Sequence, residues 1–125
     1  MLPEPHRLRR RSDFSEAVRR GRRMGRRDLV VHALERDTSN SLVSNGGPRF
    51  GLVVSKAVGP AVIRHRVARR FRHICAGLVD TVPVDTDVVI RALPGSATAS
   101  SRELDKQLRS VLERLDLLAG EGNPV

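Results

Sequence analysis

The sequence contains one cysteine, no tryptophan and no tyrosine, and three phenylalanines are its only aromatic residues. The single cysteine, Cys75, excludes an internal disulfide bond and is typical of a reducing compartment. No stretch approaches the roughly 20 consecutive apolar residues that a membrane-spanning helix needs. The N-terminus also lacks the apolar segment of a secretory signal. The sequence therefore predicts a cytoplasmic protein without a membrane partner.

Motifs for protein-based catalysis are missing as well. The chain has neither the GxSxG motif of a nucleophilic serine nor the GxxxxGK[ST] motif of a phosphate-binding loop. Its four histidines show no zinc-ligand spacing. Asp80, Asp85 and Asp87 could hold a metal ion around one turn, but solvated carboxylates are more common in such a place. We therefore predict no catalytic residue, no metal site and no cofactor on the protein.

Acidic residues are absent from residues 38–79, a stretch that carries seven basic side chains. Five of these are arginines within residues 64–72. At helical pitch the apolar residues of this segment form one stripe and the basic residues lie opposite. The stripe contains Ile63, Val67, Phe71, Ile74 and Leu78. The opposite side contains Arg66, Arg69, Arg70, Arg72 and His73. The pattern predicts a helix from about Pro60 to Val79 that buries one face and presents guanidinium groups to a polyanion.

The positive charge is unevenly distributed. The net charge is +9, and arginine outnumbers lysine 21 to 2. A planar guanidinium can donate two hydrogen bonds to one phosphate, which makes arginine the better phosphate ligand. The last helical segment is nearly charge-balanced, so the basic residues gather in the N-terminal third and the middle helix. This asymmetry indicates a nucleic-acid-binding face. Few Asn or Gln residues flank the arginines, which argues against reading DNA bases.

Apolar periodicity and chain-breaking residues predict the other elements. Ser12 is the expected N-cap of a first helix that ends at Gly21. The further expected elements are strands at Leu29–Leu34, Arg49–Ser55 and Asp87–Leu93, room for a short strand near 22–26, and a last helix with a capping box at Ser100 and Glu103. The order α-β-β-α-β-α predicts an α+β fold, a two-layer α/β sandwich with a small mixed sheet. We expect one domain at 12–119, between a basic arm at 1–11 and a frayed tail at 120–125, with a loop at 37–48.

The segment from Arg49 to Arg72, RFGLVVSKAVGPAVIRHRVARRFR, resembles the signature of the bacterial ribonuclease P protein subunit. That signature reads roughly R-x-G-[LF]-x-V-S-K-K-x-G-x-A-V-x-R-N-R-x-K-R-x-x-R. The opening of the chain, the strand DVVI at 87–90 and the last helix are also similar, so the resemblance spans Leu2 to about Leu115. It implies a subunit of an endoribonuclease that removes the 5′ leader of precursor tRNA. The RNA subunit would carry the active site and its magnesium ions. The implied fold is that of ribosomal S5 domain 2, with a left-handed β-α-β crossover through the basic helix.

The resemblance implies two sets of functional residues. The set expected to bind the ribonuclease P RNA is Ser55, Lys56, Arg64, His65, Arg66, Arg69, Arg70 and Arg72. The set expected in the leader cleft and the N-terminal arm, in contact with precursor tRNA, is Arg9, Arg10, Arg11, Phe14, Val18 and His32. Burial preference alone would place Phe14 in the core. Three positions depart from the family pattern, since His65 replaces Asn, Val18 replaces an aromatic residue and Ala57 replaces Lys. The alternative is a free-standing RNA-binding or ribosomal protein without a role in cleavage.

Overall fold

The computed structural model describes residues 2–36 and 47–118. Most of the predicted loop 37–48 and the predicted tail 120–125 lie outside these residues. No helix in the described part of the chain is both long enough and apolar enough to cross a membrane.

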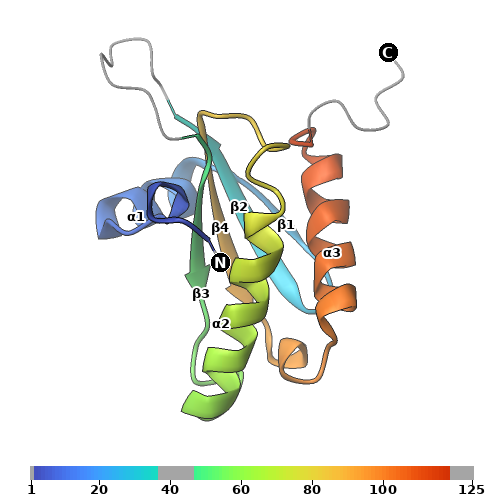
Figure 1. Cartoon of the computed structure of the whole chain (residues 1–125). Helices are drawn as coiled ribbons and strands as arrows, with labels where there is room; N and C mark the ends of the chain where they lie inside the picture. The colour runs from blue at the N-terminus through green and yellow to red at the C-terminus, as the bar shows by residue number, and fades with distance from the viewer. Residues whose placement is uncertain (1, 37–46, 119–125) are drawn as a thin grey trace.

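The described residues form three α-helices and a four-stranded sheet, which confirms the predicted α+β class (Figure 1). The elements in chain order are α1 (Arg11–Arg20), β1 (Arg22–Gly25), β2 (Leu29–Glu35), β3 (Arg49–Val53), α2 (Ala61–Ala76), β4 (Thr86–Ala92) and α3 (Ser101–Arg114), with short 3-10 helices at Glu4–His6 and Pro94–Ala97. The strand order is β1-β2-β4-β3. The first two pairings are antiparallel and the β3–β4 pairing is parallel, so the sheet is mixed as predicted.

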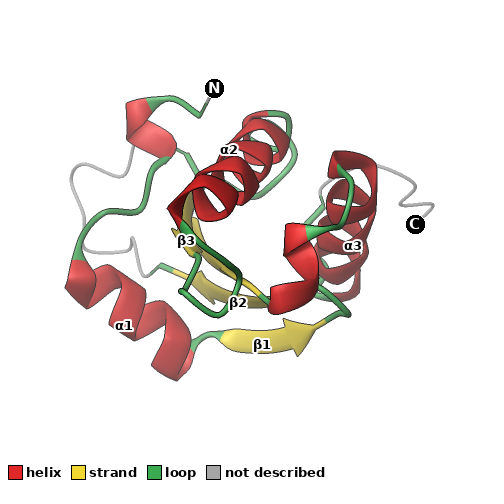
Figure 2. Cartoon of the chain, turned by 90° about the horizontal axis from the view of Figure 1, so that it is seen from below, coloured by secondary structure: helices red, strands yellow, loops and turns green. Residues whose placement is uncertain are grey.

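Helices α2 and α3 cover one face of the sheet, and α1 lies on the other face (Figure 2). The larger core lies between the sheet and α2 with α3, where Phe71 and Leu108 pack with Ile90 of β4. A smaller cluster under α1 contains Ala17 and Val89. The apolar stripe predicted for α2 is confirmed at all but its first position, because Ile63 is only partly buried.

The crossover from β3 through α2 to β4 is left-handed. In Figure 1 both strands run downward, α2 lies in front of the sheet, and β4 lies to the right of β3. A parallel β-α-β unit is right-handed in nearly all proteins. Periodicity alone would have predicted the wrong hand, whereas the family resemblance implied the correct one.

Several element boundaries differ from the predicted ones. Helix α1 begins at Arg11, and its N-cap is Arg10, which makes no side-chain cap hydrogen bond. The prediction of Ser12 as N-cap was therefore wrong, since this residue lies inside the helix. Strand β3 ends at Val53 because the chain then enters a turn in which the Val58 N–H donates to the Ser55 carbonyl at 3.1 Å. The capping box is confirmed, with Ser100 N–H to Glu103 Oε1 at 2.8 Å and Glu103 N–H to Ser100 Oγ at 3.1 Å.

The N-terminal segment before α1 lies along the edge of β3. The Leu8 N–H donates to the Phe50 carbonyl at 2.9 Å, and Arg7 Nε donates to the Leu2 carbonyl at 2.9 Å. Leu2 and Leu8 are buried, with exposures of 2% and 5%. The described part of the expected basic arm is thus attached to the sheet, while Arg9 and Arg10 remain exposed beside it.

Candidate nucleic-acid interface

The polar face of α2 carries exposed cations without acidic neighbours on the helix. Val67 and Phe71 are fully buried, so the residues between them turn outward. Arg66, Arg69 and Arg72 are exposed and make no hydrogen bond or ion pair with any described residue. The result is a row of unneutralised guanidinium groups on one side of the molecule.

Two of the predicted RNA-binding arginines also support the fold. Arg64 Nε donates to the Gly59 carbonyl at 3.1 Å, which ties the helix to the turn that precedes it. Arg70 Nη1 donates to the Ala99 carbonyl at 2.7 Å, which ties α2 to the segment before α3. Both side chains are partly buried. A guanidinium has five N–H donors, so each of them keeps further donors for a partner.

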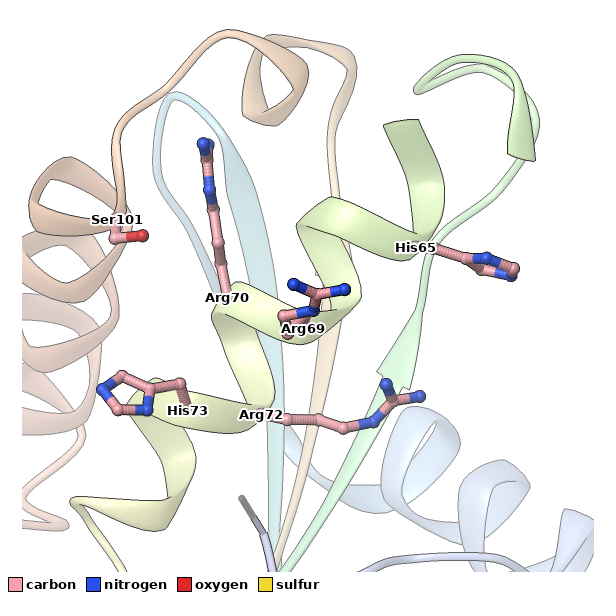
Figure 3. A pocket seen from close by; sticks show the side chains of 6 residues that line it. All are labelled: His65, Arg69, Arg70, Arg72, His73 and Ser101. Atoms are coloured by element: carbon pink, nitrogen blue, oxygen red, sulfur yellow. The ribbon is translucent and has the colours of Figure 1, made fainter. Parts of the chain in front are cut away.

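A pocket of about 550 Å³ lies between α2 and the start of α3 (Figure 3). The lining residues are His65, Arg69, Arg70, Arg72, His73 and Ser101. In Figure 3 His73 points toward α3, and Arg72 points to the opposite side, toward β3 and α1. The volume lies within the usual range of ligand pockets, about 300–1,000 Å³. Five of the six lining side chains carry nitrogen donors, which suits anionic groups.

A smaller pocket, about 240 Å³, lies where the N-terminal segment meets β3. Its lining residues are Leu2, Arg7, Leu8, Arg9, Phe14, Phe50, Leu52 and Arg72. Arg72 lines both pockets, so the polar face of α2 continues into this one. Phe14 is half-buried, and its ring lies against Gly51, where a Cβ atom would overlap it. Phe14 therefore lines an open pocket and also packs on the sheet.

The other predicted cleft residues are dispersed. Arg9 lines the small pocket but also pairs with Glu4 at 2.7 Å, with both side chains exposed. Arg10 and Arg11 are exposed at the start of α1. Val18 on α1 is 43% exposed. None of these last three lines the small pocket.

His32 lies on β2 and is only 7% exposed. Its Nδ1 atom is buried and has no hydrogen-bond partner among the described residues. Burial lowers the pKa of His32, and the positive charges of Arg23 and Arg91 lower it further. His32 is therefore a buried, neutral imidazole beside two arginines, and it does not line the small pocket.

Ser55 and Lys56, the remaining two predicted RNA contacts, are exposed in the turn between β3 and α2. Ser55 Oγ accepts a hydrogen bond from the Ala57 N–H at 3.3 Å. His65 is exposed near the start of α2 and faces the larger pocket. The eight predicted RNA contacts thus occupy one continuous stretch, the turn and the polar face of α2.

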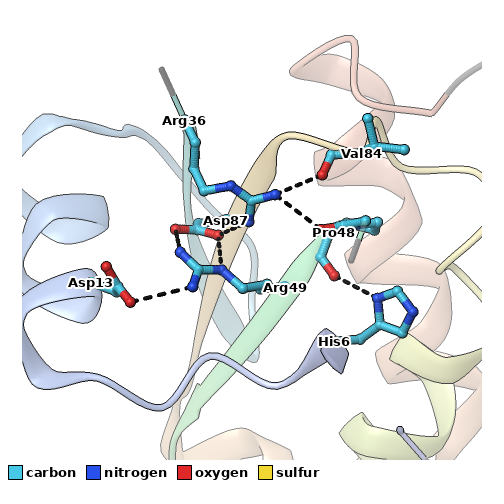
Figure 4. Close-up of polar contacts among 8 residues, drawn as sticks. His6, Asp13, Arg36, Pro48, Arg49, Val84 and Asp87 are labelled. Atoms are coloured by element: carbon cyan, nitrogen blue, oxygen red, sulfur yellow. Dashed lines mark hydrogen bonds and ion pairs between the residues drawn. The ribbon is translucent and has the colours of Figure 1, made fainter. Parts of the chain in front are cut away.

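A buried ion-pair network removes Arg49 from the basic surface (Figure 4). Asp87 is almost fully buried and accepts from Arg49 at 2.8 and 2.7 Å and from Arg36 at 2.6 Å. Arg49 also reaches Asp13 at 3.4 Å, and its hydrogen bond to Asp87 raises its pKa. The sequence interpretation of Asp87 as a solvated turn carboxylate was wrong. Only the strand register, which places Arg49 beside Asp87, explains the pairing.

In residues 2–36 and 47–118, no group of three or more His, Cys, Asp or Glu side chains is arranged to hold a metal ion. Cys75 lies on the buried face of α2, and burial raises the pKa of its thiol. The functional groups that this surface offers are therefore cationic hydrogen-bond donors and one accessible aromatic ring.

Comparisons with known proteins agree with this description. The family profile described as Ribonuclease P matches residues 2–116. The ribonuclease P protein component of Rhodococcus opacus (strain B4) is 79% identical over 123 residues, covering 98% of each chain. That of Mycobacterium avium (strain 104) is 49% identical over 122 residues, covering 98% of this chain and 99% of the relative.

Solved structures show the same fold at low identity. The ribonuclease P protein of Staphylococcus aureus matches with a TM-score of 0.77 and 20% identity, covering 90% of this chain and 97% of the other. The Thermotoga maritima protein, solved with 1-(4-fluorophenyl)-2-thiourea, matches with a TM-score of 0.72 and 24% identity, covering 86% and 98%. The match over nearly the whole sequence shows that the chain belongs to the Ribonuclease P protein family.

Proposed function

We propose that the chain is the protein subunit of ribonuclease P, which binds the catalytic RNA and the 5′ leader of precursor tRNA and assists removal of that leader. The observation that carries the proposal is the exposed face of α2, where Arg66, Arg69 and Arg72 have no partner among the described residues. Closely spaced, unpaired guanidiniums suit a polyanion with closely spaced phosphates. Relatives named ribonuclease P protein component, at 49% to 79% identity, support the same assignment.

The arginine face acts by neutralising phosphates of the catalytic RNA. Lower negative charge on that RNA reduces its repulsion of an incoming anionic substrate. Arg64 and Arg70 are held by backbone carbonyls, so their remaining donors keep a fixed direction. The RNA therefore meets a partly preorganised surface, which lowers the entropy cost of binding.

The small pocket supplies the preference for precursor over mature tRNA. Phe14 offers a ring face on which an unpaired base can stack, and Arg9 and Arg72 offer donors to the backbone of the same strand. Mature tRNA lacks the leader, so it gains none of these contacts. The pocket joins the α2 face at Arg72, which brings the leader close to the RNA subunit.

In this proposal the protein supplies neither a catalytic group nor a metal ligand, and the magnesium ions belong to the RNA. Asp87, the most buried carboxylate near the interface, is neutralised by two arginines and is unsuited to bind a cation. The chain acts in the cytoplasm, in keeping with its single, buried cysteine.

The decisive experiment incubates the purified chain with precursor tRNA at low magnesium, with and without ribonuclease P RNA. We expect cleavage that requires the RNA and increases with the protein. Cleavage by the chain alone would identify a protein nuclease. Binding of the RNA without any effect on cleavage would identify a free-standing RNA-binding or ribosomal protein. A DNA duplex that competes as well as the RNA would identify a DNA-binding protein.

A charge-matched pair of variants tests the interface itself. Replacing Arg66, Arg69 and Arg72 with Ala should weaken assembly with the RNA while the far-ultraviolet spectrum and the unfolding midpoint stay unchanged. The control replaces Arg102, Lys106 and Arg114 of α3, which are equally exposed and remove the same charge. Equal loss of assembly in both variants would contradict an interface on α2, because it would show an effect of net charge only.

A further inference from the structure

The pocket between α2 and the start of α3 is a concave site, not only a part of the exposed arginine face. Its volume of about 550 Å³ is that of a site for a whole small molecule. In Figure 3 Arg72 points away from α3, whereas His73 points toward it and Ser101 projects from α3 into the same space. Arg70 reaches the segment before α3, where it donates to the Ala99 carbonyl at 2.7 Å. The part of the pocket next to α3 is therefore formed by Arg70, His73 and Ser101.

These three side chains combine one fixed group with two unused ones. The hydrogen bond to the Ala99 carbonyl holds the guanidinium plane of Arg70, and the side chain is partly buried. His73 and Ser101 are exposed and make no hydrogen bond to any described residue. Arg70 and His73 are three residues apart on α2, so they lie on the same side of the helix. A ring face and a guanidinium face thus lie beside one another in a space that solvent can enter.

No carboxylate in the described part of the chain neutralises this pocket. Helix α2 contains no acidic residue. The first two acidic residues of α3 have other partners, since Glu103 pairs with Arg27 at 3.5 Å and Asp105 pairs with Arg109 at 2.8 Å. Arg69, which also lines the pocket, is exposed and unpaired among the described residues. The pocket therefore favours a ligand that carries negative charge.

The shape of the pocket selects among the parts of an RNA. A double helix presents its phosphates on a convex surface, so it can lie on the exposed arginines but cannot enter a gap between two protein helices. An unpaired nucleotide can leave the RNA stack, and its base then stacks on a histidine ring or on a guanidinium plane. His73 and Arg70 offer these two surfaces, and Arg69 offers donors to the attached phosphate.

We propose that the pocket between α2 and α3 receives one unpaired nucleotide of the catalytic RNA, with the base at His73 and Arg70 and the phosphate on Arg69. The inference rests on the proposed function and deepens it, because it adds an extruded base to the phosphate contacts and gives α3 a part in binding through Ser101. The RNA is favoured over a free nucleotide as the source, since Arg69 and Arg72 belong both to the pocket and to the exposed arginine face.

A substitution that fills the pocket without changing the charge tests the proposal. Ser101 is an exposed residue in the first turn of α3, and Ser101→Trp leaves the capping box of Ser100 and Glu103 intact. We expect this variant to bind ribonuclease P RNA about 5- to 150-fold more weakly, the loss that corresponds to one stacked base. The slope of log affinity against log salt should stay nearly unchanged, because the phosphates remain on the exposed arginines.

Thr98→Trp is the matched control for this variant. Thr98 is exposed, lies three residues before Ser101 and does not line the pocket. The control introduces the same side chain, and it should bind the RNA as the wild type does. Unfolding midpoints establish that both variants are folded before binding is compared.

His73 distinguishes stacking from a contact of its ring nitrogens. His73→Ala removes the ring and should weaken RNA binding about 5- to 150-fold. His73→Phe keeps a ring face without the nitrogens, so it should bind within about threefold of the wild type. Equal losses in the two variants would overturn the stacked base.

Chemical probing of the bases of the RNA locates the nucleotide. One unpaired base should be protected by the wild-type chain and reactive again with Ser101→Trp and with His73→Ala. An abasic nucleotide at that position should weaken wild-type binding and have no further effect in His73→Ala. If no unpaired base shows this pattern, the proposal is wrong.

The remaining outcomes separate this inference from the proposed function. Wild-type affinity of Ser101→Trp, an equal loss in Thr98→Trp, or a loss accompanied by a lower salt slope would overturn the inserted nucleotide and leave the arginine face as the RNA interface. Displacement of the RNA by excess adenosine monophosphate would assign the pocket to a free nucleotide and would also overturn it. A wild-type chain that neither binds the RNA nor increases cleavage would overturn the proposed function itself.

Discussion

Arg49 holds Asp87 in a bidentate ion pair across two parallel strands, with Nε to Oδ1 at 2.8 Å and Nη2 to Oδ2 at 2.7 Å. Arg36 contacts the same carboxylate at 2.6 Å. The ion pair therefore joins β3 to the neighbouring strand β4, and Arg49 also links it to α1 through Asp13.

Removing the charge of Asp87 should destabilise the protein. Asp87→Asn would leave two arginines without their counter-charge, and we expect the free energy of unfolding to fall by about 2–4 kcal/mol, somewhat less than for a fully buried pair because both guanidiniums are partly exposed. Urea unfolding at neutral pH measures the change. Asp80→Asn is the matched control, because Asp80 is exposed and has no described partner, and it should change stability by less than about 0.5 kcal/mol.

Substitutions of two neighbouring arginines of α2 should have different effects, one on the stability of the protein and the other on RNA binding. Arg70→Ala removes the hydrogen bond to the Ala99 carbonyl and should cost about 1–2 kcal/mol of stability. Arg69→Ala should leave stability nearly unchanged, and should reduce the salt slope of RNA binding by about 0.9, the value for one phosphate contact. Unfolding and salt-dependent RNA binding are measured on both variants. Equal stability losses would contradict this assignment.

The contact between Phe14 and Gly51 should be sensitive to a single methyl group. Gly51→Ala forces the ring of Phe14 from its position, and overpacking of this kind costs about 1–3 kcal/mol. Truncation in the double variant Phe14→Ala/Gly51→Ala should recover part of that loss, so the double-mutant cycle should show a coupling of at least about 0.5 kcal/mol.

Gly25→Ala provides the comparison for this experiment. The nearest atom to a Cβ at Gly25 is Val30 Cγ2 at 3.6 Å, an ordinary contact, so this substitution should be neutral or slightly stabilising. A loss at Gly25 as large as at Gly51 would show that the backbone, and not the aromatic ring, determines the cost.

The stability of the protein should depend on pH through His32. Its pKa is lower in the folded protein than its ordinary value of 6.5, chiefly because the ring is buried. His32 therefore binds a proton more readily in the unfolded chain than in the folded protein. The free energy of unfolding falls as pH falls through about 6.5. Unfolding of wild type and His32→Gln is compared between about pH 7.5 and 5.5, a range set by the ordinary pKa of histidine. The variant should lose less stability than the wild type over this range, and an identical pH dependence would contradict the prediction.

Periodicity was sufficient to predict α2 and its two faces. Val67, Phe71 and Ile74 recur at helical spacing, and the structure buries all three. The same reasoning could not show that Arg64 and Arg70 also support the fold. Their hydrogen-bond partners are the backbone carbonyls of Gly59 and Ala99. The position of a backbone carbonyl cannot be predicted from the pattern of apolar and polar residues.

The surroundings of His32 could not be predicted from the sequence either. The family resemblance implies a place in the leader cleft for this residue, which stays a prediction, and the structure adds that His32 is only 7% exposed and lies near Arg23 and Arg91. Both arginines come from strands that are far apart in the sequence, and only the register of β1 and β4 on β2 brings them together. A one-residue change of register would move either side chain to the opposite face.

Strand β4 is the last strand in the sequence, yet it is the one that hydrogen-bonds to both β2 and β3. A nascent chain that ends before Thr86 contains the β1–β2 hairpin, β3 and the arginine-rich α2, but it cannot close the sheet. An isolated hairpin is only marginally stable. Folding on the ribosome must therefore wait for Ala92 to emerge, and until then the cationic segment is displayed without the scaffold that aligns it.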